Sequence, residues 1–190
     1  MNRLTDRAHE ICGAVLSSGD VAIDATLGNG HDTLFLANTV GPDGRVYGFD
    51  IQERAIDLTS ERLGDPLRSR VELLRESHAQ METFIAEEDR GRIQVIMFNL
   101  GYLPGGEKEI TTRTESTLAA LEASCRLLHP EGVISIIAYP GHDAGLEETE
   151  AVAAYLNDLT VNGWNYQMIE AVPGSDSAPR LFLLRRQGGS

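Results

Sequence analysis

The feature that most constrains how this sequence can fold is a regular alternation of short apolar runs with helical segments. Apolar runs that predict buried strands lie at residues 21–26, 45–50, 70–77, 93–100 and 132–139. Apolar residues recur at helical spacing in residues 3–16, 31–39, 51–63, 78–88, 111–128 and 147–159. This alternation predicts an α/β fold, in which helices cover both faces of a mostly parallel sheet.

Two more strand candidates close the chain, at residues 164–172 and 180–186, with only a loop rich in Pro, Gly and Ser between them. This arrangement predicts an antiparallel hairpin at one edge of a seven-stranded sheet. A chain of 190 residues suits one domain with a substantial core. We expect that domain to span residues 1–190, with an opening helix within 1–18 and a frayed tail at 187–190.

Composition narrows the class of protein. No apolar run approaches the roughly 20 residues of a membrane helix, and the polar N-terminus has no signal-peptide pattern, so we expect a cytoplasmic protein without a membrane partner. Cys12 and Cys125 match no metal or redox spacing, so we expect reduced thiols and no metal site. The net charge of −13 argues against a broadly basic surface for nucleic acid but allows a small basic patch.

The stretch DATLGNGHDTLFLA, residues 24–37, leads from the first strand candidate into a helix through Gly28 and Gly30. Glycines let a ligand approach the backbone closely, and the start of a helix near His31 offers free N–H groups. A dinucleotide and S-adenosylmethionine both fit such a turn. Asp24 favours S-adenosylmethionine, because a carboxylate repels a pyrophosphate but attracts a sulfonium and an ammonium.

Polar residues also follow the next two strand candidates. Asp50 ends the second strand, where a carboxylate can accept hydrogen bonds from both ribose hydroxyls of either nucleotide. The segment ESHAQ, residues 76–80, follows the third strand and could contact adenine. The simpler alternatives are a tight bend at the glycines and a helix N-cap at Asp50, but the order and spacing together favour nucleoside binding.

The stretch NLGYLPGG, residues 99–106, follows the most hydrophobic strand candidate and is similar to the Asn-Pro-Pro-Tyr loop of amino-directed methyltransferases. The Asn99 side-chain oxygen and the Leu100 carbonyl can accept the protons of an amine and so direct its lone pair at a methyl group. Tyr102 can stack on a base, and Gly101 keeps the loop adaptable. The alternative is a glycine-rich surface loop without a chemical role.

Three motifs, DATLGNGHDTLFLA, FNLGYLPGG and YPGHDAG, resemble those of the MnmM-type tRNA methyltransferases, a family also labelled as rRNA methylases. The resemblance extends from about Ala22 to Leu184. It implies a Rossmann-like class I methyltransferase domain that uses S-adenosyl-L-methionine. The implied substrate is the aminomethyl group on C5 of the wobble uridine, in the anticodon stem-loop of tRNA.

The resemblance also implies the roles of individual residues. The methionine end of the cofactor would be lined by Asp24, Gly28, Asn29, Gly30, His31, Asp32 and Thr33. The ribose would be held by Asp50 and Gln52, and the adenine would lie by Ser77 and His78. The residues that face the transferred methyl group would be Asn99, Gly101 and Tyr102.

An alkylammonium must lose a proton before it can accept a methyl group, because its pKa lies near 10. His31 and His142 are the candidate bases, and Asp32 could instead steady an ammonium group. The alternative, which we favour, is catalysis mostly by positioning through Asn99, with no dedicated base.

Contacts to tRNA are expected from the few basic residues near these loops, namely Arg113, Lys108 and Arg180. Surface ion pairs with the many acids are the alternative for each. The segment PGSDSAPRLF, residues 173–182, departs from the Asn-rich, double-Pro segment of the family, so RNA contacts there are expected to differ. A homodimer could combine two basic patches.

Other functions stay open at this point. A class I methyltransferase could act on another RNA base, as in rRNA, or on a small-molecule amine. A nucleotide-binding oxidoreductase would also use such a fold, although Asp24, Thr33 and the Asn99 loop count against it. A nucleoside-binding module without catalysis is the third alternative.

Overall fold

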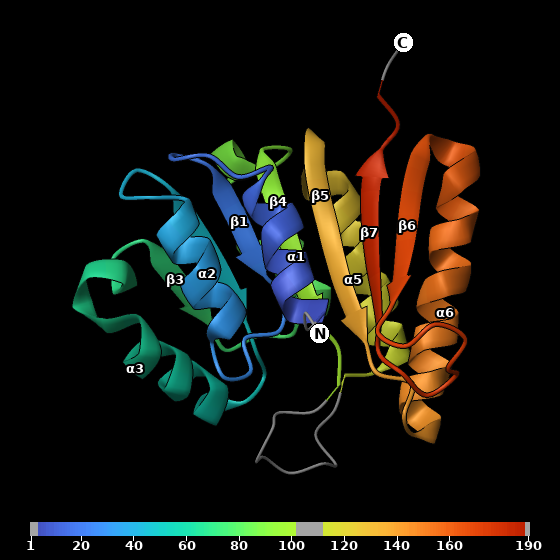
Figure 1. The fold of residues 1–190 in the computed structure, drawn as a ribbon. Helices are drawn as coiled ribbons and strands as arrows, with labels where there is room; N and C mark the ends of the chain where they lie inside the picture. Colours follow the sequence, from blue (N-terminus) through green and yellow to red (C-terminus); the bar gives the residue numbers. More distant parts are fainter. Residues whose placement is uncertain (1–3, 102–111, 189–190) are drawn as a thin grey trace.

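The computed structural model describes residues 4–101 and 112–188, in which strands and helices alternate along the chain (Figure 1). The strands are β1 (Val21–Asp24), β2 (Arg45–Phe49), β3 (Val71–Leu74), β4 (Ile93–Asn99), β5 (Leu128–Ala138), β6 (Trp164–Glu170) and β7 (Arg180–Arg186). The α-helices are α1 (Leu4–Gly13), α2 (His31–Thr39), α3 (Glu53–Arg68), α4 (Met81–Phe84), α5 (Thr114–Leu127) and α6 (Asp143–Leu159). Short 3-10 helices are η1 (His78–Gln80), η2 (Glu87–Asp89) and η3 (Thr160–Asn162).

The strands form one seven-stranded sheet in the order β3-β2-β1-β4-β5-β7-β6. The first five strands of the chain pair in parallel, whereas β7 runs antiparallel to both β5 and β6. The predicted α/β fold, with a mostly parallel sheet and an antiparallel hairpin at one edge, is therefore confirmed. The strand order reverses between β1 and β4, and ligands of open α/β sheets bind beside such a reversal, at the carboxyl ends of the strands.

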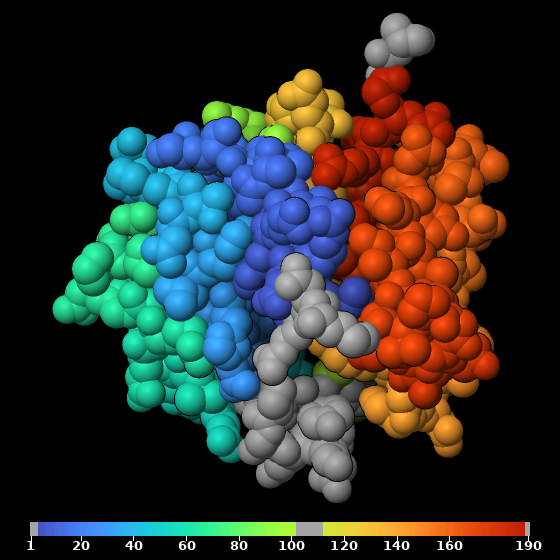
Figure 2. All heavy atoms as spheres, viewed as in Figure 1, coloured from blue at the N-terminus to red at the C-terminus, as the bar shows by residue number. Residues whose placement is uncertain are grey.

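Helices cover both faces of the sheet, and each face has its own hydrophobic core. The helices α1, α2 and α3 lie on one face, and Figure 2 shows α1 and α2 over its middle with the C-terminal hairpin beside them. The helices α4, α5 and α6 lie on the other face. Successive residues of a strand enter opposite cores, so Ala22 packs on the α1 side and Ile23 on the α5 side.

The segment predicted as a single helix at residues 78–88 is broken into η1, α4 and η2, so that prediction was wrong. Ser77 caps η1 by accepting a hydrogen bond from the N–H of Ala79 at 3.3 Å. Ile85 has extended backbone angles of φ −76° and ψ 126°, which end α4 after one turn. The buried residues Met81 and Ile85 are spaced as on one helix face. The backbone between η1 and η2 nevertheless changes direction, so this spacing does not come from one continuous helix.

Other differences concern the ends of elements. Helix α3 continues beyond residue 63 through a break at Gly64, whose φ is 63°. Helix α6 begins at Asp143, four residues before the predicted start at 147, because His142 caps it and accepts a hydrogen bond from the N–H of Gly145 at 3.0 Å. Within residues 4–101 and 112–188, no helix is long and apolar enough to cross a membrane.

Gly30 fixes the entry into α2 and the distance between α2 and α3. Its backbone is left-handed, with φ 74° and ψ 18°. A Cβ atom at this position would lie 2.8 Å from the Thr59 hydroxyl oxygen and 2.9 Å from the Thr59 Cα atom of α3. Only glycine meets both conditions, the unusual backbone angles and the close approach of a neighbouring helix.

We predict that Gly30→Ala lowers the free energy of unfolding by about 2–5 kcal/mol. About 1–2 kcal/mol comes from the left-handed backbone and about 1–3 kcal/mol from overpacking against Thr59. Gly91→Ala is the matched control, because Gly91 also has a φ of 74° but a Cβ atom there would have no neighbour within 4 Å. The control should lose only the backbone part in urea unfolding, and equal losses would contradict the role of Thr59.

Candidate active site

The buried carboxylate of Asp24, the last residue of β1, organises the glycine turn. Its two oxygens accept hydrogen bonds from the hydroxyl of Thr33 at 2.5 Å and from the backbone N–H of Thr26 at 3.1 Å. The Thr26 hydroxyl oxygen accepts a hydrogen bond from the N–H of Asn99 at 2.7 Å. Asp24 therefore connects the turn to the start of α2 and, through Thr26, to the end of β4.

The environment of Asp24 makes its negative charge costly. Burial is the largest influence, and the negative charge of Asp32 adds to it, so that the pKa of Asp24 rises to about 7. The hydrogen bonds from Thr33 and Thr26 act in the opposite direction but do not offset burial. A cation bound at this turn would favour the ionised form of Asp24.

Asp50 holds the glycine turn from the end of β2. Its two carboxylate oxygens accept hydrogen bonds from the N–H groups of Gly28 at 3.1 Å and Gln52 at 2.9 Å, and burial raises its pKa. The alternative role of Asp50 as an N-cap does not apply, because α3 begins at Glu53 and its N-cap residue is Gln52. Each carboxylate oxygen can accept one further hydrogen bond, as the two hydroxyls of a ribose would require.

The residues predicted to lie by the adenine are close to the end of β1. The Nδ1 atom of His78 lies 3.1 Å from the carbonyl oxygen of Ala25, and its ring makes an edge contact with Phe98. Burial lowers the pKa of His78, so its neutral form is favoured and Nδ1 donates to Ala25. Ser77 serves as the cap of η1.

Asn99 stands at the centre of the candidate site, at the end of β4. Its side-chain Nδ2 lies 3.4 Å from Oδ2 of Asp32, and its Oδ1 accepts a hydrogen bond from the Tyr139 hydroxyl at 2.9 Å. Tyr139 directly follows β5 and is 37% exposed. Burial and the negative charge of Asp32 raise the pKa of Tyr139, which keeps its hydroxyl protonated as a donor.

The backbone after Asn99 is anchored on both sides of residues 102–111. Gly101, with a φ of 131°, donates its N–H to the hydroxyl oxygen of Thr112 at 3.0 Å and accepts the N–H of Thr112 at 3.0 Å. The Thr112 hydroxyl donates to the buried carboxylate of Glu148 at 2.7 Å, and Thr117 donates to its other oxygen at 2.7 Å. Tyr102 and Lys108 lie outside the described residues, so their predicted roles stay predictions.

Asn99, Asp32 and Tyr139 form a cluster, here called the Asn99 cluster, and the two candidate bases are not members of it. His31 is the exposed first residue of α2. The Nδ1 atom of His142 accepts the N–H of Gly145, so a neutral His142 ring carries its proton on Nε2. In this arrangement His142 acts as a helix cap, and its role as a base stays a prediction that the hydrogen bond does not favour.

Two of the predicted RNA contacts lie on described residues. Arg113 is exposed and is the N-cap residue of α5, next to Thr112. Arg180 begins β7 and pairs in register with Ala138 of β5 and Glu170 of β6, which places it beside Tyr139 at the site edge of the sheet. Arg113 is therefore close in sequence to Thr112, which bonds to Gly101. Arg180 is close in register to Tyr139.

Sequence reasoning missed three contributors to the site. His9 on α1 lies 2.6 Å from Asp32, Tyr139 holds the Asn99 amide, and the Arg62 side chain donates to the carbonyl oxygen of Asn29 at 2.6 Å. Tyr139 opens the motif YPGHDAG and could have been found from that motif. His9 and Arg62 lie on helices outside the motifs, and no sequence pattern indicates their contacts with Asp32 and Asn29.

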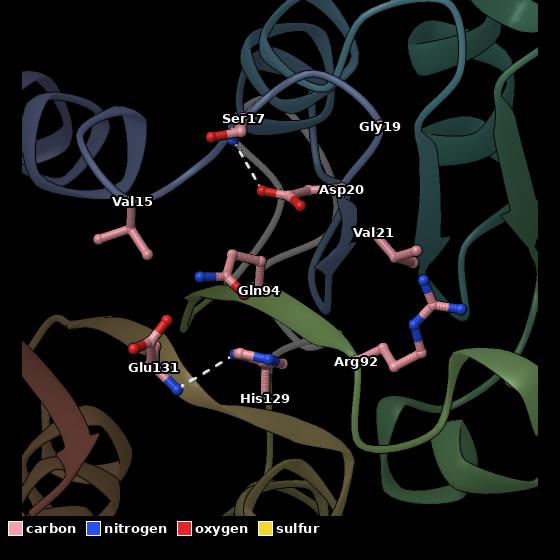
Figure 3. A pocket seen from close by; sticks show the side chains of 9 residues that line it. All are labelled: Val15, Ser17, Gly19, Asp20, Val21, Arg92, Gln94, His129 and Glu131. Carbon is pink, nitrogen blue, oxygen red and sulfur yellow. Dashed lines mark hydrogen bonds between the residues drawn. The ribbon is translucent and has the colours of Figure 1, made fainter. Parts of the chain in front are cut away.

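A separate hollow of about 390 Å³ lies at the opposite edge of the sheet, where β1, β4 and β5 begin (Figure 3). It is lined by Val15, Ser17, Gly19, Asp20, Val21, Arg92, Gln94, His129 and Glu131. None of the predicted site residues lines it. Among the described residues, no group of three or more His, Cys, Asp and Glu side chains is placed to hold a metal ion.

The elevated pKa of Asp24 predicts a pH dependence of stability. Because the folded protein binds this proton more tightly than the unfolded chain, whose aspartate pKa is about 3.8, stability from Asp24 is present below pH 4 and lost as pH rises to about 7. Asp24→Asn should therefore gain melting temperature relative to the wild type between pH 4 and 7. The control Asp57→Asn removes the same charge at an exposed position of α3. A constant difference for Asp24→Asn would contradict the assignment.

Comparisons with known proteins identify the family to which this chain is similar. A family model described as "Putative rRNA methylase" matches residues 46–185. A tRNA (mnm(5)s(2)U34)-methyltransferase, chloroplastic, from Arabidopsis thaliana is 41% identical over 179 residues, which cover 88% of this chain and 65% of that relative. The chain thus spans about two thirds of the length of that relative.

Two solved structures are also similar to this chain along nearly its whole length. A crystal structure from Clostridium thermocellum, which has the same description as the family model, is similar to this chain. The TM-score is 0.91 and the sequence identity is 36%, with 98% of each chain covered. A methyltransferase from Streptococcus mutans, in complex with S-adenosylhomocysteine, has a TM-score of 0.84 and 27% identity, with 98% of this chain and 99% of that chain covered. The chain therefore belongs to the rRNA methylase family and has the Rossmann-like fold of class I S-adenosylmethionine-dependent methyltransferases.

Proposed function

We propose that this protein is an S-adenosylmethionine-dependent methyltransferase that methylates the amine of a 5-aminomethyl-uridine at the wobble position of tRNA. The observation that carries the proposal is the Asn99 side chain, whose amide is held by Asp32 and Tyr139 at the carboxyl end of β4. The glycine turn with its buried acid lies directly beside it. The 41% identical relative named for wobble-uridine methylation supports the choice of substrate.

The acids at the turn fit the charge of the proposed cofactor. When bound, S-adenosylmethionine supplies a methyl group activated by a positively charged sulfur. Asp24 ends β1 and Asp32 lies in the first turn of α2, so the two acids flank the glycine turn, where a sulfonium and an ammonium would lower the cost of their negative charges. Asp50 offers acceptor positions for the ribose, and the backbone at Gly28 is left-handed, with a φ of 51°. These features also count against a dinucleotide, whose pyrophosphate would meet the same acids.

The Asn99 cluster fits an amine as the methyl acceptor. The side-chain oxygen of Asn99 and the carbonyl oxygen of Leu100 can accept amine protons and leave the lone pair directed at the methyl group. In this proposal the substrate ammonium loses its proton to water before transfer. A neighbouring sulfonium favours that loss, because it lowers the pKa of the amine.

The basic residues near the site support an RNA substrate, although the chain carries a net charge of −13. Arg180 and Arg113 would contact phosphates of the anticodon stem-loop, and Lys108 completes the proposed set. We also propose a cytoplasmic location and a homodimer that combines two such patches. Both remain part of the proposal.

A second substrate class is a base of ribosomal RNA, which the description of the matched family favours. The test is direct: the purified protein is incubated with labelled S-adenosylmethionine and either tRNA bearing 5-aminomethyl-uridine, unmodified rRNA, or a small aminomethyl compound. We expect label in the wobble nucleoside of tRNA alone, identified by mass spectrometry. Label in rRNA or in the small amine, with none in tRNA, would overturn the proposed substrate.

For the chemistry, we predict that Asn99→Ala lowers the turnover number about 10²–10³-fold at saturating cofactor, because one positioned acceptor for the amine is lost. The dissociation constant for S-adenosylmethionine should change less than about threefold. The measurement is single-turnover methyl transfer together with calorimetric titration. Unchanged turnover would refute the role of Asn99.

For RNA binding, we predict that Arg180→Ala raises the KM for tRNA about tenfold and reduces the salt dependence of binding by about one counterion. Arg92→Ala removes the same charge at the opposite edge of the sheet, beside the hollow of Figure 3, and serves as the control. Filter binding over a range of salt concentrations measures the salt dependence of tRNA binding for both variants, and methyl-transfer kinetics measure their KM. Equal effects of the two variants would mean that Arg180 acts only through net charge.

A further inference from the structure

His9 contacts the candidate active site from α1, a helix to which the sequence assigned no chemical role. Its Nε2 atom lies 2.6 Å from Oδ1 of Asp32, and its side chain is 27% exposed. The ring stacks on Phe35 with 4.1 Å between ring centroids and 6° between planes. Phe35 lies one turn after Asp32 on the same face of α2, so the stack holds the imidazole with Nε2 directed at the carboxylate.

Asp32 in turn decides which side of the Asn99 amide faces the substrate. An ionised carboxylate only accepts hydrogen bonds, so it must face the Nδ2 group of Asn99, which lies 3.4 Å from Oδ2. The Oδ1 atom of Asn99 then points to the opposite side, where the Tyr139 hydroxyl donates to it at 2.9 Å. A reversed amide would set oxygen against oxygen at Asp32, whereas the Tyr139 hydroxyl can donate or accept, so Asp32 is the contact that sets the orientation of the amide.

Each member of this chain of contacts is held by a different element. His9 comes from α1, Asp32 from α2, Asn99 from β4, and Tyr139 from the residue after β5. Asp32 is 7% exposed, so few water molecules can replace the hydrogen bond from His9. Without that bond, the carboxylate would lose one of the side-chain partners that the described residues supply, and with it the fixed direction of Oδ2.

We propose that His9 is a positioning residue for methyl transfer: it fixes Asp32, which fixes the Asn99 amide with its oxygen toward the acceptor amine. The inference rests on the proposed function, because it gives the amide oxygen a substrate to face. His9 does not touch the reacting atoms. Its contribution is the loss of rotational freedom in the Asn99 side chain before the amine arrives.

Two substitutions separate this role from simple packing. His9→Phe keeps an aromatic ring for the stack on Phe35 but removes the hydrogen bond to Asp32. His9→Gln removes the stack but brings an amide NH₂ group to about the place of the imidazole Nε2 atom. We expect His9→Phe to lower the turnover number about tenfold or more with little change in the dissociation constant for S-adenosylmethionine, and His9→Gln to restore most of the turnover.

The side-chain amide of Asn99 gives a second readout that needs no tRNA. Its two amide proton resonances, assigned by comparison with Asn99→Ala, should shift in His9→Phe and stay near their wild-type positions in His9→Gln. If the wild type fails to methylate tRNA, the proposed substrate fails, while these resonances still decide the role of His9. Equal turnover and equal Asn99 resonances in His9→Phe and the wild type would overturn the inference, and so would a loss that follows the stack rather than the hydrogen bond.

Discussion

The buried carboxylate of Asp24 is the contact on which the rest of the site depends. It accepts the Thr33 hydroxyl and the Thr26 N–H, and Thr26 accepts the N–H of Asn99, so one side chain aligns the end of β1, the start of α2 and the end of β4. Burial makes this charge costly, which the pKa of about 7 reflects. A cation bound at the turn would lower the cost of this charge. The architecture and the proposed cofactor therefore support each other.

The same acids organise the acceptor side of the site. Asp32 lies between His9 and Asn99, and its negative charge also raises the pKa of Asp24 and of Tyr139. The Asn99 amide is thus held on both sides: the Tyr139 hydroxyl donates to its Oδ1 atom, and Asp32 accepts from its Nδ2 group. An amine needs an acceptor of fixed direction more than it needs a strong base, because an adjacent sulfonium already favours the neutral amine. This view agrees with the cap-like hydrogen bond of His142, which engages the nitrogen that a base would use.

Much of the fold could be predicted from the sequence, because apolar periodicity reports burial on a sheet or on a helix face. The prediction from periodicity failed at residues 78–88, where Met81 and Ile85 are buried but the backbone forms three short helical pieces instead of one helix. In the candidate site, the turn residues and Asn99 could be predicted to lie together because they follow strands in order, and the structure brings them into contact. His9 and Arg62 were not found, since their contacts with Asp32 and Asn29 depend on how α1 and α3 pack, which local spacing does not encode.

We propose that a cationic methyl donor binds at the turn between β1 and α2, beside Asp24 and Asp50. Calorimetric titration of the purified protein with S-adenosylmethionine, and separately with NAD, tests it most directly. We predict saturable heat for S-adenosylmethionine and none for NAD, with the S-adenosylmethionine signal lost in Asp50→Ala. Saturable binding of NAD, with no heat from S-adenosylmethionine, would contradict the account.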